Sequence, residues 1–185
     1  MAKLIYSAIM SLDGFIADAE GNFDWGVPDQ EVHRFINARE RTVQHYLYGR
    51  RLYDVMSAWD SWDTSSEPAH IDAFAQLWRQ AQKLVFSRTL KEPSTGNTRI
   101  VSEFNAGEVR ELKASANNDI LIGGPELATQ AFQDGLVDEC QLYIVPILVG
   151  AGKKGLPEGI GAKLELLQER TFGNGTVFLR YRVPS

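Results

Sequence analysis

The sequence predicts a single α/β domain over residues 1–185, with helices on both faces of a mainly parallel, mixed β-sheet. Three observations support this prediction. Over the first three quarters of the chain, short apolar runs typical of strands alternate with helical stripes spaced i, i+3, i+4. The last quarter is rich in strand patterns and contains a Gly-Asn-Gly turn, which predicts antiparallel strands at one edge. A length of 185 residues with 44% hydrophobic residues suits one core of ordinary size.

Short apolar runs predict the parallel strands, and each ends at a turn or directly before a helix. In chain order they are Lys3–Met10, Val43–Tyr48, Lys83–Ser87, Thr98–Val101 and Asp119–Ile122. A further short run, Phe15–Ala17, follows the turn Asp13-Gly14. Because helical segments separate most of these runs, parallel pairing is expected.

Helical stripes fill the segments between these runs. Pro28 opens the first helix, and Asp29 suits its positive end. Asn105 begins a weak capping box, Pro125 opens the last helix, and Gly135 ends it. The stripes are Val32, Phe35 and Ile36; Leu52, Val55, Met56 and Trp59; Phe74, Leu77, Trp78 and Ala81; and Val109 with Leu112.

The last quarter of the chain reads as β-structure. Val137–Val149 is predicted as one long strand, interrupted by Gly150–Gly152. Another strand begins at Leu164. Val177, Leu179, Tyr181 and Val183 alternate with Phe178, Arg180 and Arg182. They directly follow the turn Gly173–Gly175, so this strand and the preceding one are predicted to form a hairpin.

Composition excludes several classes of protein and site. The net charge of −5 argues against nucleic-acid binding, so any anion site must be local. Cys140 is the only cysteine and cannot form an internal disulfide, and Met1–Tyr6 lacks the apolar run of a secretory signal, which together predict a cytoplasmic protein. Apolar stretches are too short for a membrane span. His33, His45 and His70 lack metal-ligand spacing, so no metal is expected.

Three predicted strand ends carry glycine, serine or arginine. They are Gly49-Arg50-Arg51, Ser87-Arg88 and Gly123-Gly124. Ligands bind at the carboxyl ends of parallel strands, where glycine admits a phosphate close to the backbone and arginine contacts it directly. Together these corners predict a long polyphosphate ligand such as a dinucleotide. Each corner alone is also explained by a plain turn or a solvated helix start.

Two loop segments hold the remaining candidate residues. Asp13-Gly14 is either a simple turn or the border of a site for a reactive ring, with Asp13 or Asp24 facing that ring. Trp25 is either a core or lid aromatic or stacks on a substrate. Asp29 is either a helix-start charge or a proton donor. The Gly-x-Ser-x-Gly and Gly-Lys-Ser/Thr motifs of other enzyme classes are missing from the sequence.

Five motifs follow one another along nearly the whole chain: Ser11–Ala17, Tyr48–Tyr53, Val85–Arg88, Ile122–Leu127 and Val145–Gly152. In this order and spacing they resemble the dihydrofolate-reductase-like family that includes the reductase domain of the bacterial riboflavin-biosynthesis deaminase–reductase. The resemblance implies a three-layer αβα fold, NADPH as hydride donor and a homodimer formed through the late strands.

The resemblance also implies a place for each part of NADPH. The adenosine and phosphate end is assigned to Gly49, Arg50, Arg51, Ser87 and Arg88. The pyrophosphate and nicotinamide are assigned to Gly123, Gly124, Glu126 and Leu127. Backbone close to the nicotinamide is assigned to Ala8, Ile16 and Ala17.

These assignments lead us to expect an NADPH-dependent oxidoreductase of a small heterocyclic substrate, resembling 5-amino-6-(5-phosphoribosylamino)uracil reductase. Hydride would pass to a C=N or C=O carbon, with Asp13 as a polar substrate contact and Asp24 and Trp25 beside the substrate. Dihydrofolate or pterin reduction is an alternative. The folate-reducing branch of the family binds the pterin ring with an acidic residue of the first long helix. Asp29 lies near that position and would polarise the ring, although an alignment anchored on Trp25 places Gln30 there instead. A non-catalytic nucleotide-binding homodimer is the other alternative.

Overall fold

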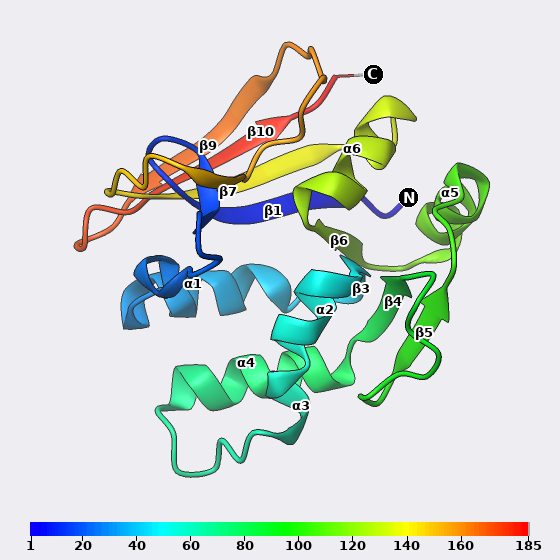
Figure 1. Ribbon diagram of the computed structural model, residues 1–185, viewed down its shortest axis with the longest axis horizontal. Helices are drawn as coiled ribbons and strands as arrows, with labels where there is room; N and C mark the ends of the chain where they lie inside the picture. The colour runs from blue at the N-terminus through cyan, green and yellow to red at the C-terminus, as the bar shows by residue number, and fades with distance from the viewer. Residues whose placement is uncertain (185) are drawn as a thin grey trace.

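The main sheet consists of parallel strands with an antiparallel hairpin at one edge (Figure 1). The computed structural model describes residues 1–184, and in them the sheet contains β1 (Leu4–Ser11), β3 (Val43–Gly49), β4 (Gln82–Phe86), β5 (Thr98–Val101), β6 (Asp119–Gly123), β7 (Glu139–Val145), β9 (Glu165–Thr171) and β10 (Val177–Arg182). Their order is β5-β4-β3-β6-β1-β7-β10-β9. Neighbours from β5 to β7 are parallel, and β10 is antiparallel to β7 and β9, so the predicted mixed sheet is confirmed.

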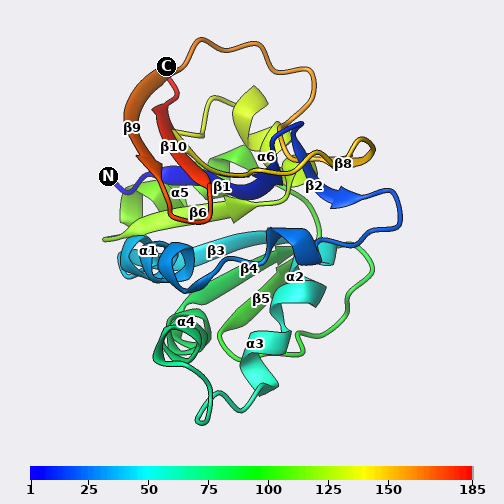
Figure 2. The same ribbon diagram turned by 90° about the vertical axis from the view of Figure 1, so that its left-hand side faces the viewer.

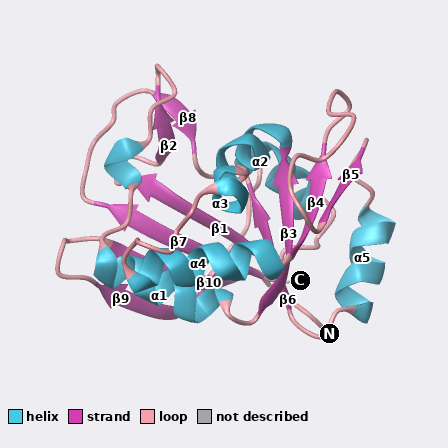
Figure 3. Ribbon diagram, turned by 90° about the horizontal axis from the view of Figure 1, so that it is seen from below, coloured by secondary structure: helices cyan, strands magenta, loops and turns pink. Residues whose placement is uncertain are grey.

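Helices cover both faces of this sheet, as the three-layer prediction requires (Figures 2 and 3). One face packs against α1 (Gln30–Glu40) and α4 (Ala69–Gln80), and the other against α5 (Ala106–Ser115) and α6 (Pro125–Gln133). The short helices α2 (Arg50–Met56) and α3 (Ala58–Ser61) follow β3, and the single turn η1 (Asp24–Gly26) precedes α1. Within residues 1–184, no helix combines the length and the apolar character needed to cross a membrane.

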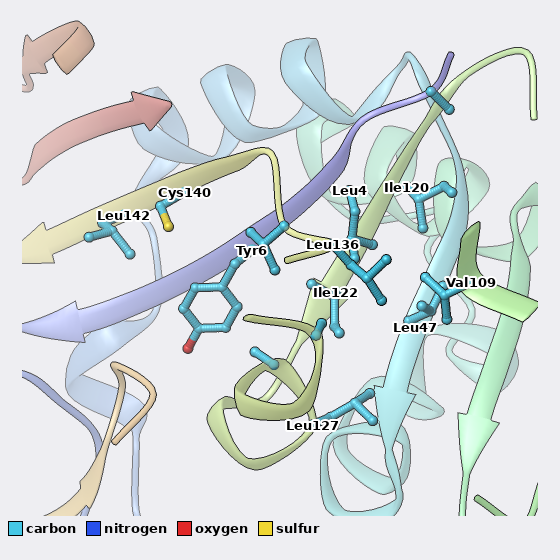
Figure 4. Close-up of a cluster of buried hydrophobic side chains, with 14 of the residues drawn as sticks. Leu4, Tyr6, Leu47, Val109, Ile120, Ile122, Leu127, Leu136, Cys140 and Leu142 are labelled. Atoms are coloured by element: carbon cyan, nitrogen blue, oxygen red, sulfur yellow. The ribbon is translucent and has the colours of Figure 1, made fainter. Parts of the chain in front are cut away.

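Strand β1 contributes to two cores, because successive side chains point to opposite faces of a sheet. Leu4 and Tyr6 are fully buried in the cluster on the α5 and α6 face, where they pack with Ile120 and Ile122 of β6 (Figure 4). Ile5 is buried in the cluster on the α1 and α4 face. Burying each such side chain contributes about 1.5–3 kcal/mol. This two-sided burial explains why the parallel strands are apolar along most of their length.

Most helix boundaries agree with the capping signals. The Asp29 carboxylate accepts a hydrogen bond from the Val32 backbone N–H at 3.0 Å, and α1 begins at Gln30 rather than at Pro28. Asn105 accepts bonds from the first turn of α5, as predicted. The α6 helix begins at Pro125 and ends before Gly135. At the starts of α1 and α5, the side-chain acceptors satisfy backbone N–H groups that have no partner inside the helix.

Two predicted elements are wrong in extent. The long strand predicted over Val137–Val149 is limited to β7, because Pro146 has no N–H for the ladder and the chain turns away after Val145. The single helix predicted from the stripe Leu52 to Trp59 is divided into α2 and α3 at Ser57, whose hydroxyl donates to the Asp54 carbonyl at 2.8 Å.

A separate two-stranded ribbon pairs β2 (Phe15–Asp18) with β8 (Gly152–Lys154) in antiparallel register. Gly152 makes this pairing possible. Its φ of +142° disfavours other residues, and a Cβ at this position would lie 2.0 Å from the Ala17 carbonyl oxygen. The ribbon is joined to the rest of the fold by the Tyr6 hydroxyl, which donates to the Gly155 carbonyl.

We therefore expect Gly152→Ala to lower the free energy of unfolding by more than about 1 kcal/mol, since both the backbone conformation and the space forbid a side chain. Urea denaturation measures this change. Gly161→Ala is the matched control, because open space surrounds that glycine and its φ is ordinary. Equal stability of the two variants would contradict the close approach of β8 to β2.

His33 of α1 is 6% exposed and packs edge-on against His70 and Phe74 of α4, with ring centroids 5.1 Å and 5.5 Å away. Two of the three histidines thus meet in space, although they are far apart in the sequence. Burial lowers the pKa of His33 below its ordinary value of 6.5, and the nearby charge of His70 lowers it further.

The unfolded chain therefore binds a proton at His33 more readily than the folded chain. The stability due to His33 is complete above pH 6.5 and decreases as the pH falls below it, by at most about 1.4 kcal/mol per pH unit. We expect His33→Gln to flatten the fall in unfolding free energy between pH 7.5 and pH 5. Arg34→Gln, at the exposed neighbouring position, should keep the wild-type slope in urea titrations. If the unfolding free energies of wild type and His33→Gln fell in parallel with pH, protonation of His33 would not be the cause of the fall.

Candidate active site

A cleft of about 1640 Å³ opens at the carboxyl ends of the parallel strands. Its lining comes from the ends of β3 and β4, the middle of β1, helix α2, Gly124 with the first turn of α6, and the β2–β8 ribbon. The residues of the three predicted corners that line it are Gly49, Arg50, Arg51, Ser87, Arg88, Gly124, Glu126 and Leu127. The structure therefore brings the three corners to a common rim.

The edge of β1 forms the inner wall of the cleft. β1 pairs with β7 from Ile5 to Ser11, but its register with β6 ends at Tyr6. Beyond Tyr6, the backbone edge on the β6 side is left facing the cleft, where Ala8 is part of the lining. Ile16 and Ala17 of β2 line the same cleft. An exposed strand edge offers N–H and C=O groups for hydrogen bonds with a ligand.

The two glycines after β6 have different structural roles. Gly124 adopts a φ of +88°, which turns the chain from β6 into α6 and directs the first turn of that helix to the cleft. Gly123 is buried, and a Cβ there would lie 2.4 Å from Leu52 Cδ2. Because glycine has no side chain, α2 can pack directly against β6 at this position. Within residues 1–184, Gly123 does not line the cleft.

Charged side chains meet around the first turn of α6. Lys153 Nζ of β8 lies 3.0 Å from Glu126 Oε1, and Arg51 Nη1 of α2 lies 3.7 Å from the same oxygen. The hydrogen bond and charge of Lys153, with a smaller effect of Arg51, lower the pKa of Glu126. Arg50 pairs with Asp54 at 2.7 Å. Sequence reasoning missed Lys153, because it lies in a very short strand without an apolar pattern.

The corner after β4 is held by its own turn. The Ser87 hydroxyl accepts hydrogen bonds from the Leu90 N–H at 3.1 Å and the Thr89 N–H at 3.3 Å, while the Ser87 N–H donates to the Val101 carbonyl at 2.9 Å. Ser87 thus has a local turn role as well as a place in the cleft lining. Arg88, which follows it, is exposed and also lines the cleft.

Asp13 ties two loops together. Its carboxylate accepts hydrogen bonds from the Ser11 hydroxyl at 2.6 Å, the Gly150 N–H at 2.7 Å and the Val149 N–H at 3.1 Å. These bonds, led by the one from Ser11, lower the pKa of Asp13 to about 2. The carboxylate is therefore an ionised hydrogen-bond acceptor at neutral pH, and it holds the turn between β1 and β2 against the segment that leads into β8.

The structure separates the other predicted polar residues from the cleft. Among residues 1–184, the cleft lining leaves out Asp13, Asp24, Trp25 and Asp29. The Asp29 carboxylate is occupied by capping α1, and the Trp25 indole N–H is buried. The lining instead includes apolar side chains that sequence reasoning did not select: Ile9, Phe23, Leu52, Val55 and Met56. Four of them have the helical or strand spacing of ordinary core residues and Phe23 lies in a loop, so the sequence carries no separate signal for them.

Comparisons with known proteins agree with this architecture. The family model of the RibD C-terminal domain matches residues 2–178. The uncharacterized protein YyaP of Bacillus subtilis is 33% identical over 189 residues, which cover 97% of this chain and 94% of YyaP. A putative riboflavin biosynthesis protein from Shewanella sp. PV-4 superposes with a TM-score of 0.77 at 23% identity, over the full length of both chains.

A further solved structure is similar over only part of its length. The diaminohydroxyphosphoribosylaminopyrimidine deaminase/5-amino-6-(5-phosphoribosylamino)uracil reductase of Thermotoga maritima has a TM-score of 0.66 at 13% identity, over 99% of this chain and 57% of that one. At such identities the structural likeness establishes the fold, whereas the family match spans nearly the whole chain. The resemblance drawn from the five sequence motifs is thereby confirmed, and the chain belongs to the family of RibD C-terminal domains.

Proposed function

We propose that this protein is an NADPH-dependent oxidoreductase that reduces a small heterocyclic molecule in the cleft. One observation carries the proposal: the glycine and arginine corners after β3, β4 and β6 share a single rim with the exposed edge of β1. A long anionic cofactor can contact all of them at once. The reductase named for the Thermotoga structure is consistent with the same type of reaction.

The lining residues suit a dinucleotide lying along the rim. Arg50, Ser87 and Arg88 would hold the adenosine and its 2′-phosphate, since arginine forms charge-assisted, often bidentate bonds to phosphate. The first turn of α6 after Gly124 would hold the diphosphate, because its N–H groups have no partner inside the helix. A Cβ at Gly49 or Gly124 would meet no atom within 4 Å, so both positions leave room for a ligand at the backbone.

The nicotinamide would lie against the edge of β1 at Ala8 and against Ile16 and Ala17 of the ribbon. When bound, NADPH supplies the hydride for the reduction. The protein's own contribution is the positioning of the cofactor and the substrate. Ile9, Phe23, Val55 and Met56 form apolar parts of the cleft lining that suit the flat ring of a heterocycle.

Asp13 serves this proposed site as a positioning residue. By binding the backbone at Val149 and Gly150, its carboxylate holds the ribbon that carries Ile16, Ala17 and Lys153. A pKa of about 2 makes Asp13 unsuited to donate a proton near neutral pH. The proton needed at the substrate would then come from solvent reaching the open cleft.

We also propose that the protein works in the reducing cytoplasm, which suits a chain whose single cysteine cannot form an internal disulfide. Cys140 is buried in the apolar core, and burial raises the pKa of its thiol to about 12. A thiol of this kind resists oxidation and has no part in the proposed reaction, because the thiolate is the reactive form. The chemistry therefore depends on the bound cofactor and not on a cysteine.

We propose in addition that two copies of the chain associate through the late strands. β9 is an edge strand, and apolar side chains on and beside it are exposed: Leu164 by 37%, Leu166 by 53% and Leu167 by 37%. An edge strand with exposed leucines invites pairing with another chain. A second copy of the same strand would cover these side chains and the unpaired backbone together.

The cofactor assignment is tested by titrating the protein with NADPH while following nicotinamide fluorescence. We expect saturable binding, and we expect Arg88→Met to raise the Kd for NADPH roughly tenfold while changing the Kd for NADH little, since NADH lacks the 2′-phosphate. Arg99→Met, at an exposed position on β5, is the matched control and should bind both cofactors like wild type. No binding at millimolar NADPH would exclude the proposed activity.

Association is tested by size-exclusion chromatography with light scattering. We expect a dimer for the wild-type chain and a monomer for Leu166→Glu, because a carboxylate buried without a partner in an apolar interface is strongly disfavoured. Val27→Glu replaces an apolar residue that is 67% exposed elsewhere and should remain dimeric. A monomeric wild type, or a dimeric Leu166→Glu, would overturn the proposed interface.

A further inference from the structure

A charged bridge joins three elements across the cleft. Glu126, in the first turn of α6, contacts Lys153 of β8 at 3.0 Å and Arg51 of α2 at 3.7 Å, and both cations approach the same carboxylate oxygen, Oε1. The three side chains belong to the cleft lining. The carboxylate is 76% exposed and Arg51 is 82% exposed, so solvent and solutes reach the bridge from the cleft.

Lys153 is held in place from both sides. Its strand pairs with β2, the Gly155 N–H donates to the Gly14 carbonyl at 2.7 Å, and the Asp13 carboxylate binds the backbone at Gly150. The Lys153 side chain is only 33% exposed, which is low for a lysine on a surface ribbon. The adjacent Lys154 instead pairs with Glu158 at 2.6 Å. The ribbon therefore presents one lysine to the cleft and the next one elsewhere.

The position of the Glu126 carboxylate is one that favours anions of any kind. It lies in the first turn of α6, where backbone N–H groups are unpaired and the helix dipole is positive. It also lies between two cations. Ion pairs between exposed groups contribute little to stability, because water and salt screen them. A ligand with greater negative charge can therefore displace the carboxylate at small cost.

We propose that Lys153 and Arg51 form the diphosphate-binding pair of this cleft, and that Glu126 is an internal anion which holds both cations in position until a diphosphate displaces it. The proposal depends on the proposed function for the identity of the natural cofactor, but it applies to any nucleoside diphosphate. It assigns a binding role to Lys153 and a competing role to Glu126.

The experiment measures the binding of ADP-ribose by titration calorimetry, with adenosine as the probe that lacks phosphate. Lys153→Met should raise the Kd for ADP-ribose roughly tenfold, since a charge-assisted bond to phosphate is lost. Lys154→Met should leave it unchanged. Glu126→Gln should lower the Kd about threefold, because the amide no longer competes for the cations or repels the phosphates. None of the variants should alter the Kd for adenosine.

The outcomes separate this inference from the proposed function. Equal ADP-ribose binding by wild type, Lys153→Met and Lys154→Met would overturn the inference, as would weaker binding by Glu126→Gln or no binding of ADP-ribose by wild type. Equal binding by Lys153→Met and wild type, or weaker binding by Glu126→Gln, would not contradict the proposed NADPH oxidation with a heterocyclic substrate. Conversely, Lys153-dependent binding of ADP-ribose without any NADPH binding would support the diphosphate pair and remove the reductase proposal.

Discussion

The early end of β6 is the constraint on which the cleft depends. β6 lies between β3 and β1, yet its register with β1 stops at Tyr6, while β1 continues to Ser11 beside β7. The chain leaves the sheet at Gly124 with a positive φ and enters α6 at once. A gap therefore opens in the middle of the sheet, with a strand edge on one side and helix starts around it. Any ligand in this gap meets backbone groups that no strand has satisfied.

The β2–β8 ribbon closes one end of this gap, and its position depends on a few polar contacts together with Ile16, which packs against the core. Gly152 allows the two strands to approach, the Asp13 carboxylate binds the segment leading into β8, and the Tyr6 hydroxyl binds Gly155. These contacts bring Lys153 to Glu126 at the start of α6. An acidic protein thereby concentrates cations at one place, which reconciles a net charge of −5 with the anion binding proposed for the cleft.

Sequence reasoning was most successful where a residue acts through its local backbone. The parallel strands, the capping residues Asp29 and Asn105, and the glycine and arginine corners all follow from short patterns that tertiary packing leaves intact. It failed for Lys153, whose partner on α6 is distant in the sequence. It also overextended β7, because the apolar run continues past Pro146 to Val149 although proline has no N–H for the ladder. Asp13 was singled out, but its partners at residues 149 and 150 are also distant.

The sequence by itself determined the order of strands and helices, the family, and which strand ends carry glycine and arginine, because hydrophobic period and turn chemistry are local properties. Only the tertiary structure decided that these ends share one rim, that Gly123 seats α2 while Gly124 turns the chain, and that Glu126 lies between Arg51 and Lys153. Such relations depend on the register and spacing of strands from distant parts of the chain, which no local pattern encodes.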